Sequence, residues 1–184
     1  MYSRFEDLDI DKLRYQAQMI HYFGLGFIQI KMNEQHRLHV YIPDLPSIVS
    51  SESVHNHRYD FSSIVLAGVL FQDIFAVVSG ETHILEDDAC TEGMKSNKPP
   101  EPCAVSLLSS QNFVAGSRYY IHKDVYHTVD TTTNAITLLS RGEKTKQFAQ
   151  VVTPVDAPKV CPFSKKIPEE ELWERVAEAL ASHT

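Results

Sequence analysis

The chain is poor in cysteine, has no long apolar run and carries no excess of basic residues. Its three cysteines are odd in number and widely spaced, which favours reduced thiols in a cytosol over a disulfide scaffold: Cys90, Cys103 and Cys161. The longest uninterrupted apolar stretch, Ile64 to Phe71, is far shorter than the roughly 20 residues that a membrane span needs. A net charge of −7 disfavours nucleic acid and anionic membranes as partners, because both would repel the protein.

These absences leave a soluble globular protein as the expectation. Glu6, Asp7 and Asp9 stand where a signal peptide would have a basic region and an apolar block, so we expect a cytoplasmic protein. Of the 184 residues, 43% are hydrophobic and 22% are charged, which suits one domain over residues 1–184 with a sizeable core. No internal repeat and no low-complexity tract marks a second domain.

Helical patterns stand at both ends. In the N-terminal segment, about 1–24, Ser3 and Glu6 have the spacing of a capping box. A stripe of apolar residues at roughly helical spacing follows, and glycines end it: Leu8, Leu13, Ala17, Ile20 and Phe23, then Gly24 and Gly26. At the other end, 167–182, Pro168 and three glutamates suit a first helical turn, and Leu172, Val176 and Leu180 form the apolar stripe.

The middle of the chain, 26–153, is rich in short strand patterns. Runs of Ile, Val, Leu and aromatic residues recur at spacings of about 8–12 residues, which indicates a sandwich or barrel and not a parallel α/β sheet. Residues 86–103 interrupt this rhythm with acidic residues, prolines and lysines, so we expect an exposed loop there. The sequence predicts a mainly β fold with a helix at each end.

Two histidines at a spacing of two are the first chemical signal. In an extended chain His55 and His57 point to the same side, about 7 Å apart along the strand, and can converge on one metal ion. Such an HxH pair is weak evidence alone, since a chain with nine histidines would often show one. Whether the HxH pair indicates a metal site depends on the residues around it.

The stretches HNHRYDFSSIVLAG (55–68) and GSRYYIHKDVYH (116–127) together resemble the cupin superfamily. His55, His57 and Gly68 fall on the spacing of its first motif, G(x)5HxH(x)3–4E(x)6G. Gly116 and His127 fall on that of the second, G(x)5PxG(x)2H(x)3N, in the right order. The resemblance covers about residues 50–142. It implies a double-stranded β-helix (the cupin jelly-roll barrel) with a metal held by His55, His57 and His127.

The departures from these motifs bear on the chemistry. Phe61 or Ser62 stands where the first motif has its Glu ligand, and Asp60 is the one acid nearby that could substitute. Strict alternation turns Phe61 inward and Asp60 outward, although a turn after Arg58 could reset the phase. In the second motif the proline, the second glycine and the asparagine are replaced by His122, Asp124 and Thr131.

Three neutral imidazoles with open positions suit a divalent transition metal such as Fe(II), Zn(II), Ni(II), Co(II) or Cu(II). Cupins without the Glu ligand resemble thiol dioxygenases and β-diketone-cleaving dioxygenases, which implies Fe(II) and O₂. If Asp60 is a ligand instead, the site resembles the carboxylate-containing Fe(II) triad or a Mn(II) site. The residues leave both ligand sets open.

Further candidates lie around this group. Arg141 shares a strand face with inward positions and could bind a carboxylate, as could Arg58, although a strand-end charge in water explains Arg141 equally well. Tyr120 and Tyr126 could donate hydrogen bonds to substrate, against the simpler reading of aromatic packing. Asp60 could also orient a histidine from behind the metal ligands. Cys90 and Cys103 flank the polar loop but lack further soft ligands for zinc.

We therefore expect a metal-dependent cupin enzyme, in the first place an Fe(II) dioxygenase acting on a small polar molecule, with Asp60, Arg141 and Tyr120 as catalytic candidates. A Zn(II)-, Ni(II)- or Mn(II)-dependent isomerase, lyase or hydrolase on the same scaffold is the first alternative. A non-catalytic cupin that binds a small molecule is the second. Since cupins often dimerise, the resemblance also leaves a homodimer open.

Overall fold

The computed structural model describes residues 4–48, 54–88, 96–158 and 160–183. The described chain is mainly β, with two antiparallel sheets and two α-helices, which confirms that part of the prediction. Ser3 and Cys90, which the sequence analysis singled out, lie outside the described residues. Within them, no helix is long and apolar enough to cross a membrane.

The first sheet has six strands in the order β1-β2-β3-β10-β5-β8, and the second has five in the order β11-β4-β9-β6-β7. The strands of the first sheet are β1 (Met19–Phe23), β2 (Phe27–Lys31), β3 (His36–Tyr41), β10 (Ala135–Arg141), β5 (Phe61–Ala67) and β8 (Arg118–Ile121). Those of the second are β11 (Gln150–Pro154), β4 (Val54–His55), β9 (Tyr126–Asp130), β6 (Val69–Asp87) and β7 (Glu101–Val114).

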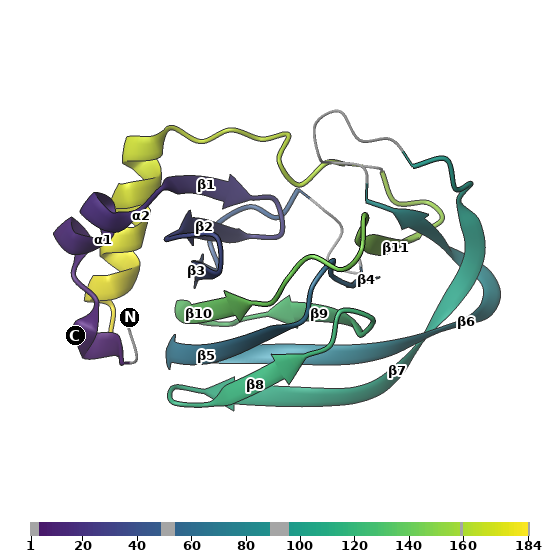
Figure 1. Cartoon of the computed structure of the whole chain (residues 1–184), viewed down its shortest axis with the longest axis horizontal. Helices are drawn as coiled ribbons and strands as arrows, with labels where there is room; N and C mark the ends of the chain where they lie inside the picture. The colour runs from purple at the N-terminus through teal and green to yellow at the C-terminus, as the bar shows by residue number, and fades with distance from the viewer. Residues whose placement is uncertain (1–3, 49–53, 89–95, 159, 184) are drawn as a thin grey trace.

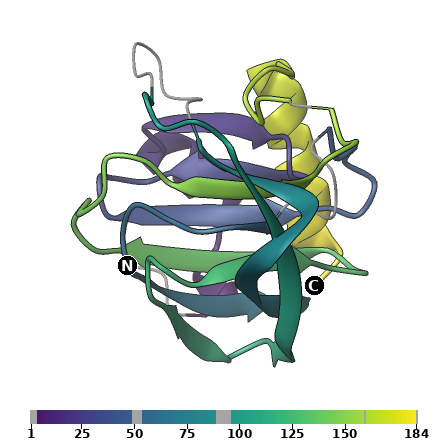
Figure 2. The same ribbon diagram turned by 90° about the vertical axis from the view of Figure 1, so that its right-hand side faces the viewer.

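The helices lie together at one end of the molecule, and the long strands β6 and β7 bend at the opposite end (Figure 1). A 3-10 turn (η1, Phe5–Asp7) and α1 (Ile10–Gln16) precede the first sheet, and α2 (Glu169–Ala181) closes the chain. Figure 2 shows β6 and β7 running across the strands of the other sheet, with α2 along one side. The helices therefore cover one face of the six-stranded sheet and leave its other face to the second sheet.

The division of the core follows from strand alternation. Side chains on the outer face of the first sheet pack against α1 and α2, with Leu13, Trp173 and Val176 contacting strand residues such as Ile30 and Leu138. Side chains on the inner face meet the second sheet in two smaller clusters, which contain Val65 with Leu70, and Phe61 with Leu139. The face of each sheet that turns toward the other is called the inner face below.

The N-terminal helix is shorter than the sequence pattern indicated. Helix α1 ends at Gln16, because Ala17 has an extended backbone and Gln18 pairs with Lys31 of the sheet. The residues after it form β1, in which Ile20 and Tyr22 pack against the helices. The apolar spacing that suggested one helix over 1–24 thus contains a strand with a period of two. The C-terminal helix keeps to within two residues of its expected range.

The expected loop over 86–103 is also shorter among the described residues. Strand β6 continues to Asp87, and β7 begins at Glu101. Cys103 pairs with His83 in the β6–β7 ladder and is buried. Long-range pairing therefore extends both strands into a stretch whose local composition favours turns.

Gly68 marks the point where the chain leaves the six-stranded sheet at the end of β5 and enters the five-stranded sheet as β6. Its φ is +76°, and a Cβ there would lie 2.1 Å from the carbonyl oxygen of Asn134. Gly116 has a similar φ of +88°, but nothing lies within 4 Å of its Cβ position. Both glycines fall on the motif spacings, and both have a left-handed backbone conformation that favours glycine. At Gly68 a second requirement is added, because the backbone of another segment lies too close for a side chain.

Gly68→Ala and Gly116→Ala should therefore differ sharply in their effect on folding. At Gly116 the cost is that of the left-handed conformation alone, roughly 1–2 kcal/mol. At Gly68 the backbone of β10 must also move, so the loss in the free energy of unfolding should be larger by several-fold, on the order of 3–5 kcal/mol. Denaturant titration of both variants measures this, and equal losses would contradict the close approach.

Candidate metal centre

Strand pairing brings the three histidines of the two motifs together. His55 ends β4 and lies directly opposite His127 of β9 in the antiparallel register. His57 follows two residues later, and its backbone N–H donates to the carbonyl of Lys123 at 3.2 Å. One possible ligand nitrogen from each ring lies within 4.8 Å of the others, so the three residues could hold a metal ion. They are called the histidine group below.

Asn56, the residue between His55 and His57, fixes the direction of both histidines. Asn56 is 2% exposed, and its amide forms a paired contact with Gln150: Asn56 Oδ1 accepts from the Gln150 backbone at 2.7 Å, and Asn56 Nδ2 donates to Gln150 Oε1 at 3.3 Å. The Asn56 backbone N–H also donates to the Gln150 carbonyl at 3.0 Å. Because Asn56 is held on one side by β11, His55 and His57 are both directed to the other side.

The three rings are close and nearly equidistant. Their centroids are separated by 5.1 Å for His55–His57, 4.8 Å for His55–His127 and 5.1 Å for His57–His127. The Nε2 atoms of His57 and His127 are 2.8 Å apart. Two lone pairs cannot face each other at this separation unless a proton or cation lies between them. If both nitrogens bound one tetrahedral Zn(II) with Zn–N distances of about 2.0–2.1 Å, they would lie roughly 3.3 Å apart. The two Nε2 atoms would therefore need to separate only slightly to bind one ion.

Burial favours the neutral form of two of the three histidines, His57 and His127. Burial lowers the pKa of His57 well below its usual value, and the neighbouring His127 and His55 lower it further. Burial likewise lowers the pKa of His127, which is only 2% exposed, with a further contribution from His55. Neutral imidazoles keep a lone pair for a metal at neutral pH, so the donor chemistry of the group fits a borderline divalent cation.

Gln72 of β6 contacts His127 at Nδ1, the ring nitrogen that does not face His57. Its side chain is 1% exposed, and Nε2 lies 2.7 Å from Nδ1 of His127, while Oε1 is buried with no partner among the described residues. A half-turn of the amide would pair Oε1 with Nδ1–H of His127, and Nε2 of His127 would then carry the lone pair that faces Nε2 of His57. Gln72 is thus placed to hold His127 in the tautomer that a metal requires.

Aromatic rings wall the group on the side of the first sheet. Phe61 is 4% exposed, and its ring centroid lies 4.8 Å from that of His57 and 6.3 Å from that of His127. Tyr59 lies 5.9 Å from His57, also ring to ring. Phe61 stands at the position of the motif glutamate and faces inward, as strict alternation indicates. An apolar ring therefore lies beside His57 at the sequence position where the motif has a glutamate.

Asp60 lies apart from the histidine group. Its Oδ1 accepts from the backbone N–H of Lys123 at 2.8 Å, which lowers the pKa of its carboxyl, and lies 3.7 Å from Nε2 of His122. The side chain is 37% exposed. Asp60 therefore organises the connection between β8 and β9, and its described contacts include none of the three histidines.

The side chains of Arg141 and Tyr120 also lie outside the histidine group. Arg141 Nη2 lies 3.2 Å from Glu34 Oε2, its Nε donates to the Glu34 carbonyl, and its guanidinium lies 5.3 Å from the centroid of the Tyr59 ring. Tyr120 is 59% exposed on the outer face of β8. The sequence placed all three catalytic candidates near the site, but their side chains do not join the histidine group.

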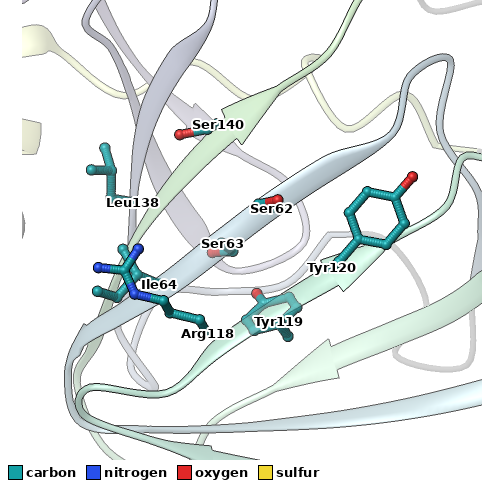
Figure 3. Close-up of a pocket in the computed structure, with 8 residues that line it drawn as sticks. All are labelled: Ser62, Ser63, Ile64, Arg118, Tyr119, Tyr120, Leu138 and Ser140. Atoms are coloured by element: carbon teal, nitrogen blue, oxygen red, sulfur yellow. The ribbon is translucent and has the colours of Figure 1, made fainter.

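A cavity of about 350 Å³ opens on the first sheet (Figure 3). Eight residues of β5, β8 and β10 line it, and none belongs to the histidine group: Ser62, Ser63, Ile64, Arg118, Tyr119, Tyr120, Leu138 and Ser140. Most of them, including Tyr120, lie on the outer face. This cavity therefore does not carry the chemistry that the histidines offer.

Comparisons with known proteins yield no family. No family model matches the chain, and no curated protein matches it. One similar solved structure is Drosophila melanogaster CENP-C bound to CAL1, with a TM-score of 0.39, 9% identity, and coverage of 72% of this chain and 94% of that one. Another is hydroquinone 1,2-dioxygenase from Sphingomonas sp. TTNP3 with 4-hydroxybenzoate bound, with a TM-score of 0.32, 10% identity, and coverage of 60% and 61%. Both scores are below 0.5, so the functional argument rests on the geometry of the site.

Gln72→Leu should weaken metal binding while leaving the three ligands in place. Removing an outer partner of a ligand histidine typically costs 10–100-fold in metal affinity. Gln72→Glu keeps an acceptor against Nδ1–H and should retain the affinity. Gln111→Leu is the matched control, because Gln111 lies opposite Gln72 in the β6–β7 ladder and is exposed. Competition with a chelator for Zn(II) measures all three, and an unchanged affinity in Gln72→Leu would contradict the role of Gln72.

Proposed function

We propose that the chain is a cupin-type metalloenzyme: its two sheets form a double-stranded β-helix barrel, and His55, His57 and His127 hold a divalent transition metal. The observation that carries the proposal is the convergence of three imidazole nitrogens, each from a motif position, within 4.8 Å. Fe(II) is the preferred metal and a dioxygenase reaction on a small polar molecule the preferred activity. This preference rests on the resemblance to cupins without the glutamate ligand.

The composition of the group supports a catalytic rather than a structural metal. Structural zinc sites close their coordination with four protein ligands, whereas catalytic sites keep a position open. Within the described residues the group contains three ligands, and the ring of Phe61 stands where a fourth would be. A phenyl ring cannot coordinate, so the open positions are left to substrate and solvent.

The neutral donors matter for the charge of the site. Three imidazoles add no negative charge, so a bound divalent ion would keep its full charge next to the substrate. When bound, such an ion supplies Lewis acidity and open coordination positions, and Fe(II) adds redox chemistry with O₂. The chain itself holds the three rings through the β4–β9 pairing and the Asn56–Gln150 contact. Phe61 and Tyr59 shield the His57 side of the group from water.

A Lewis-acid reaction is the second candidate, because three neutral histidines are also a ligand set of catalytic zinc. In that case the site would polarise a carbonyl or activate water, and a Zn(II)-, Ni(II)- or Mn(II)-dependent hydrolase, lyase or isomerase would result. Oxygen uptake separates the two. The Fe(II)-loaded protein should consume O₂ during turnover of its substrate, and turnover without O₂ uptake favours the Lewis-acid reaction.

Metal content tests the ligand assignment directly. We expect near-stoichiometric transition metal in the reconstituted protein and a fall to background in His55→Ala, His57→Ala and His127→Ala, measured by elemental analysis after gel filtration. His122→Ala and Asp60→Ala are the matched controls, because both residues lie near the β8–β9 connection and outside the group. They should keep their metal. Loss of metal in Asp60→Ala with normal folding would contradict the three-histidine assignment.

A further inference from the structure

Polar side chains line part of the inner face of the first sheet, where a core is usually apolar. His21, Gln29, His39 and Thr137 lie side by side in register on β1, β2, β3 and β10. Gln29, His39 and Thr137 are buried, and Gln29 contacts His39 at 3.0 Å between their Nε2 atoms. The adjacent row, with Phe27, Tyr41 and Ala135, is apolar or aromatic. The sheet thus presents a polar band to the space that it shares with the histidine group.

Arg37 borders this band two residues from His39 on β3, an even spacing that turns both to the same face. Its Nη1 donates to the hydroxyl of Tyr59 at 3.0 Å. Its Nε is buried and has no hydrogen-bond partner among the described residues. The side-on edge of the guanidinium, formed by Nε and Nη2, bonds to none of the described residues and is the edge that binds a carboxylate in bidentate fashion.

No carboxylate of the described chain pairs with Arg37. Glu34, the acid at this end of the sheet, contacts Lys31 and lies 3.2 Å from Arg141. An uncompensated guanidinium with a buried N–H is costly in free energy, and a structure keeps one where it serves a purpose. Arg141, which the sequence offered as an anion anchor, is already bound to Glu34, so Arg37 is the better candidate.

The surroundings of Arg37 carry an excess of positive charge, although the whole chain has a net charge of −7. Burial lowers the pKa of Lys144, and the nearby charges of Arg58, Arg141 and Arg37 lower it further. The charge of Arg37 also contributes to the lowered pKa of His39, behind the larger effect of burial. This local cationic field would attract a small anion toward an otherwise acidic protein.

One aromatic ring separates this cationic end from the histidine group. The guanidinium of Arg37 lies 5.8 Å from the centroid of the Tyr59 ring, and that ring lies 5.9 Å from the ring of His57. The Tyr59 ring therefore contacts both the guanidinium of Arg37 and the ring of His57.

We propose that Arg37 is a substrate-binding residue that anchors the carboxylate of a small anionic substrate through its Nε–Nη2 edge, beside the metal centre. This proposal rests on the proposed function. It deepens that function because it narrows the substrate from any small polar molecule to a small carboxylate. The hydroxyl of Tyr59 accepts from Nη1 of Arg37 and so helps to hold the guanidinium in place, and the rings of Tyr59 and Phe61 both contact His57.

Butyrate and its neutral isostere butyramide test the anchor without knowledge of the substrate. The titration uses metal-free, full-length protein, so that binding of butyrate to a metal does not contribute. NMR of isotope-labelled arginine side chains follows the Nε–H signals. We expect butyrate to shift the Arg37 signal saturably and butyramide to leave it unchanged. The absence of any saturable butyrate shift would overturn the proposal.

Variants assign the effect to one side chain. Arg37→Lys keeps the charge but loses the bidentate edge, and Arg37→Met loses both. Because neither variant has an Arg37 signal, binding is measured by calorimetric titration, and each variant should bind butyrate at least about tenfold more weakly than the wild type, in line with the loss of a charge-assisted hydrogen bond. Arg118→Met, on the outer face of β8, is the matched control and should bind as the wild type does. Unchanged binding in folded Arg37→Met, or loss in Arg141→Met instead, would also overturn the assignment.

The same samples separate this proposal from the proposed function. Zn(II) binding to Arg37→Met should equal that of the wild type, because Arg37 is not a ligand. If the wild type binds Zn(II) through the histidine group but gives no butyrate shift, the anchor alone fails. If butyrate binds at Arg37 but the histidine group takes up no metal, the proposed function fails and an anion-binding protein is left.

Discussion

The antiparallel register between β4 and β9 is the constraint on which the candidate site depends. It sets His55 opposite His127, and β4 has no other residue that could take this place, since it is only Val54 and His55. The Asn56–Gln150 contact ties the same segment to β11 and so directs His57 toward the same centre. A slip of one residue in this pairing would turn the side chains to the opposite face and disperse the group.

Burial and electrostatics then give the site its character. The three rings lie between two sheets, where desolvation favours neutral imidazole, and Gln72 can select the tautomer of His127. Among the described residues the group has three neutral donors, and Phe61 stands at the position of the motif glutamate, so a divalent ion bound to these three alone would keep its positive charge. The guanidinium of Arg37, whose Nε has no hydrogen-bond partner among the described residues, lies beside the Tyr59 ring. The neutral metal donors and this guanidinium are the two features on which the proposed metal and the proposed anionic substrate rest.

Much of this could be predicted from local patterns. The HxH spacing, the distance from Gly116 to His127 and the alternation of Asp60 and Phe61 depend on neighbouring residues alone. The structure brings His55, His57 and His127 together and turns Phe61 toward His57. Gly68 lies where the spacing predicts a motif glycine, and its contact with Asn134 explains the requirement. The mainly β fold and the two terminal helices follow from composition and periodicity in the same way.

What local patterns could not supply depends on pairing between distant segments. Arg37, Tyr59 and Gln72 come from separate strands or connections, and only the assembled sheets bring them to the histidines. The pairing of Arg141 with Glu34 and the contact of Asp60 with Lys123 likewise depend on which loops meet, so neither residue's role could be inferred from strand phase. The strand β1 within the expected helix shows the same effect, because the partner β2 decides its conformation. The cytoplasmic location and the homodimer stay predictions.

The most direct test of the central claim is a structure of the metal-loaded protein with the anomalous signal of the bound ion. We expect one ion between the sheets with a nitrogen atom of His55, His57 and His127 each within about 2.0–2.3 Å, and no oxygen atom of Asp60 among its ligands. An ion bound elsewhere, or one coordinated by Asp60 in place of a histidine, would contradict the account.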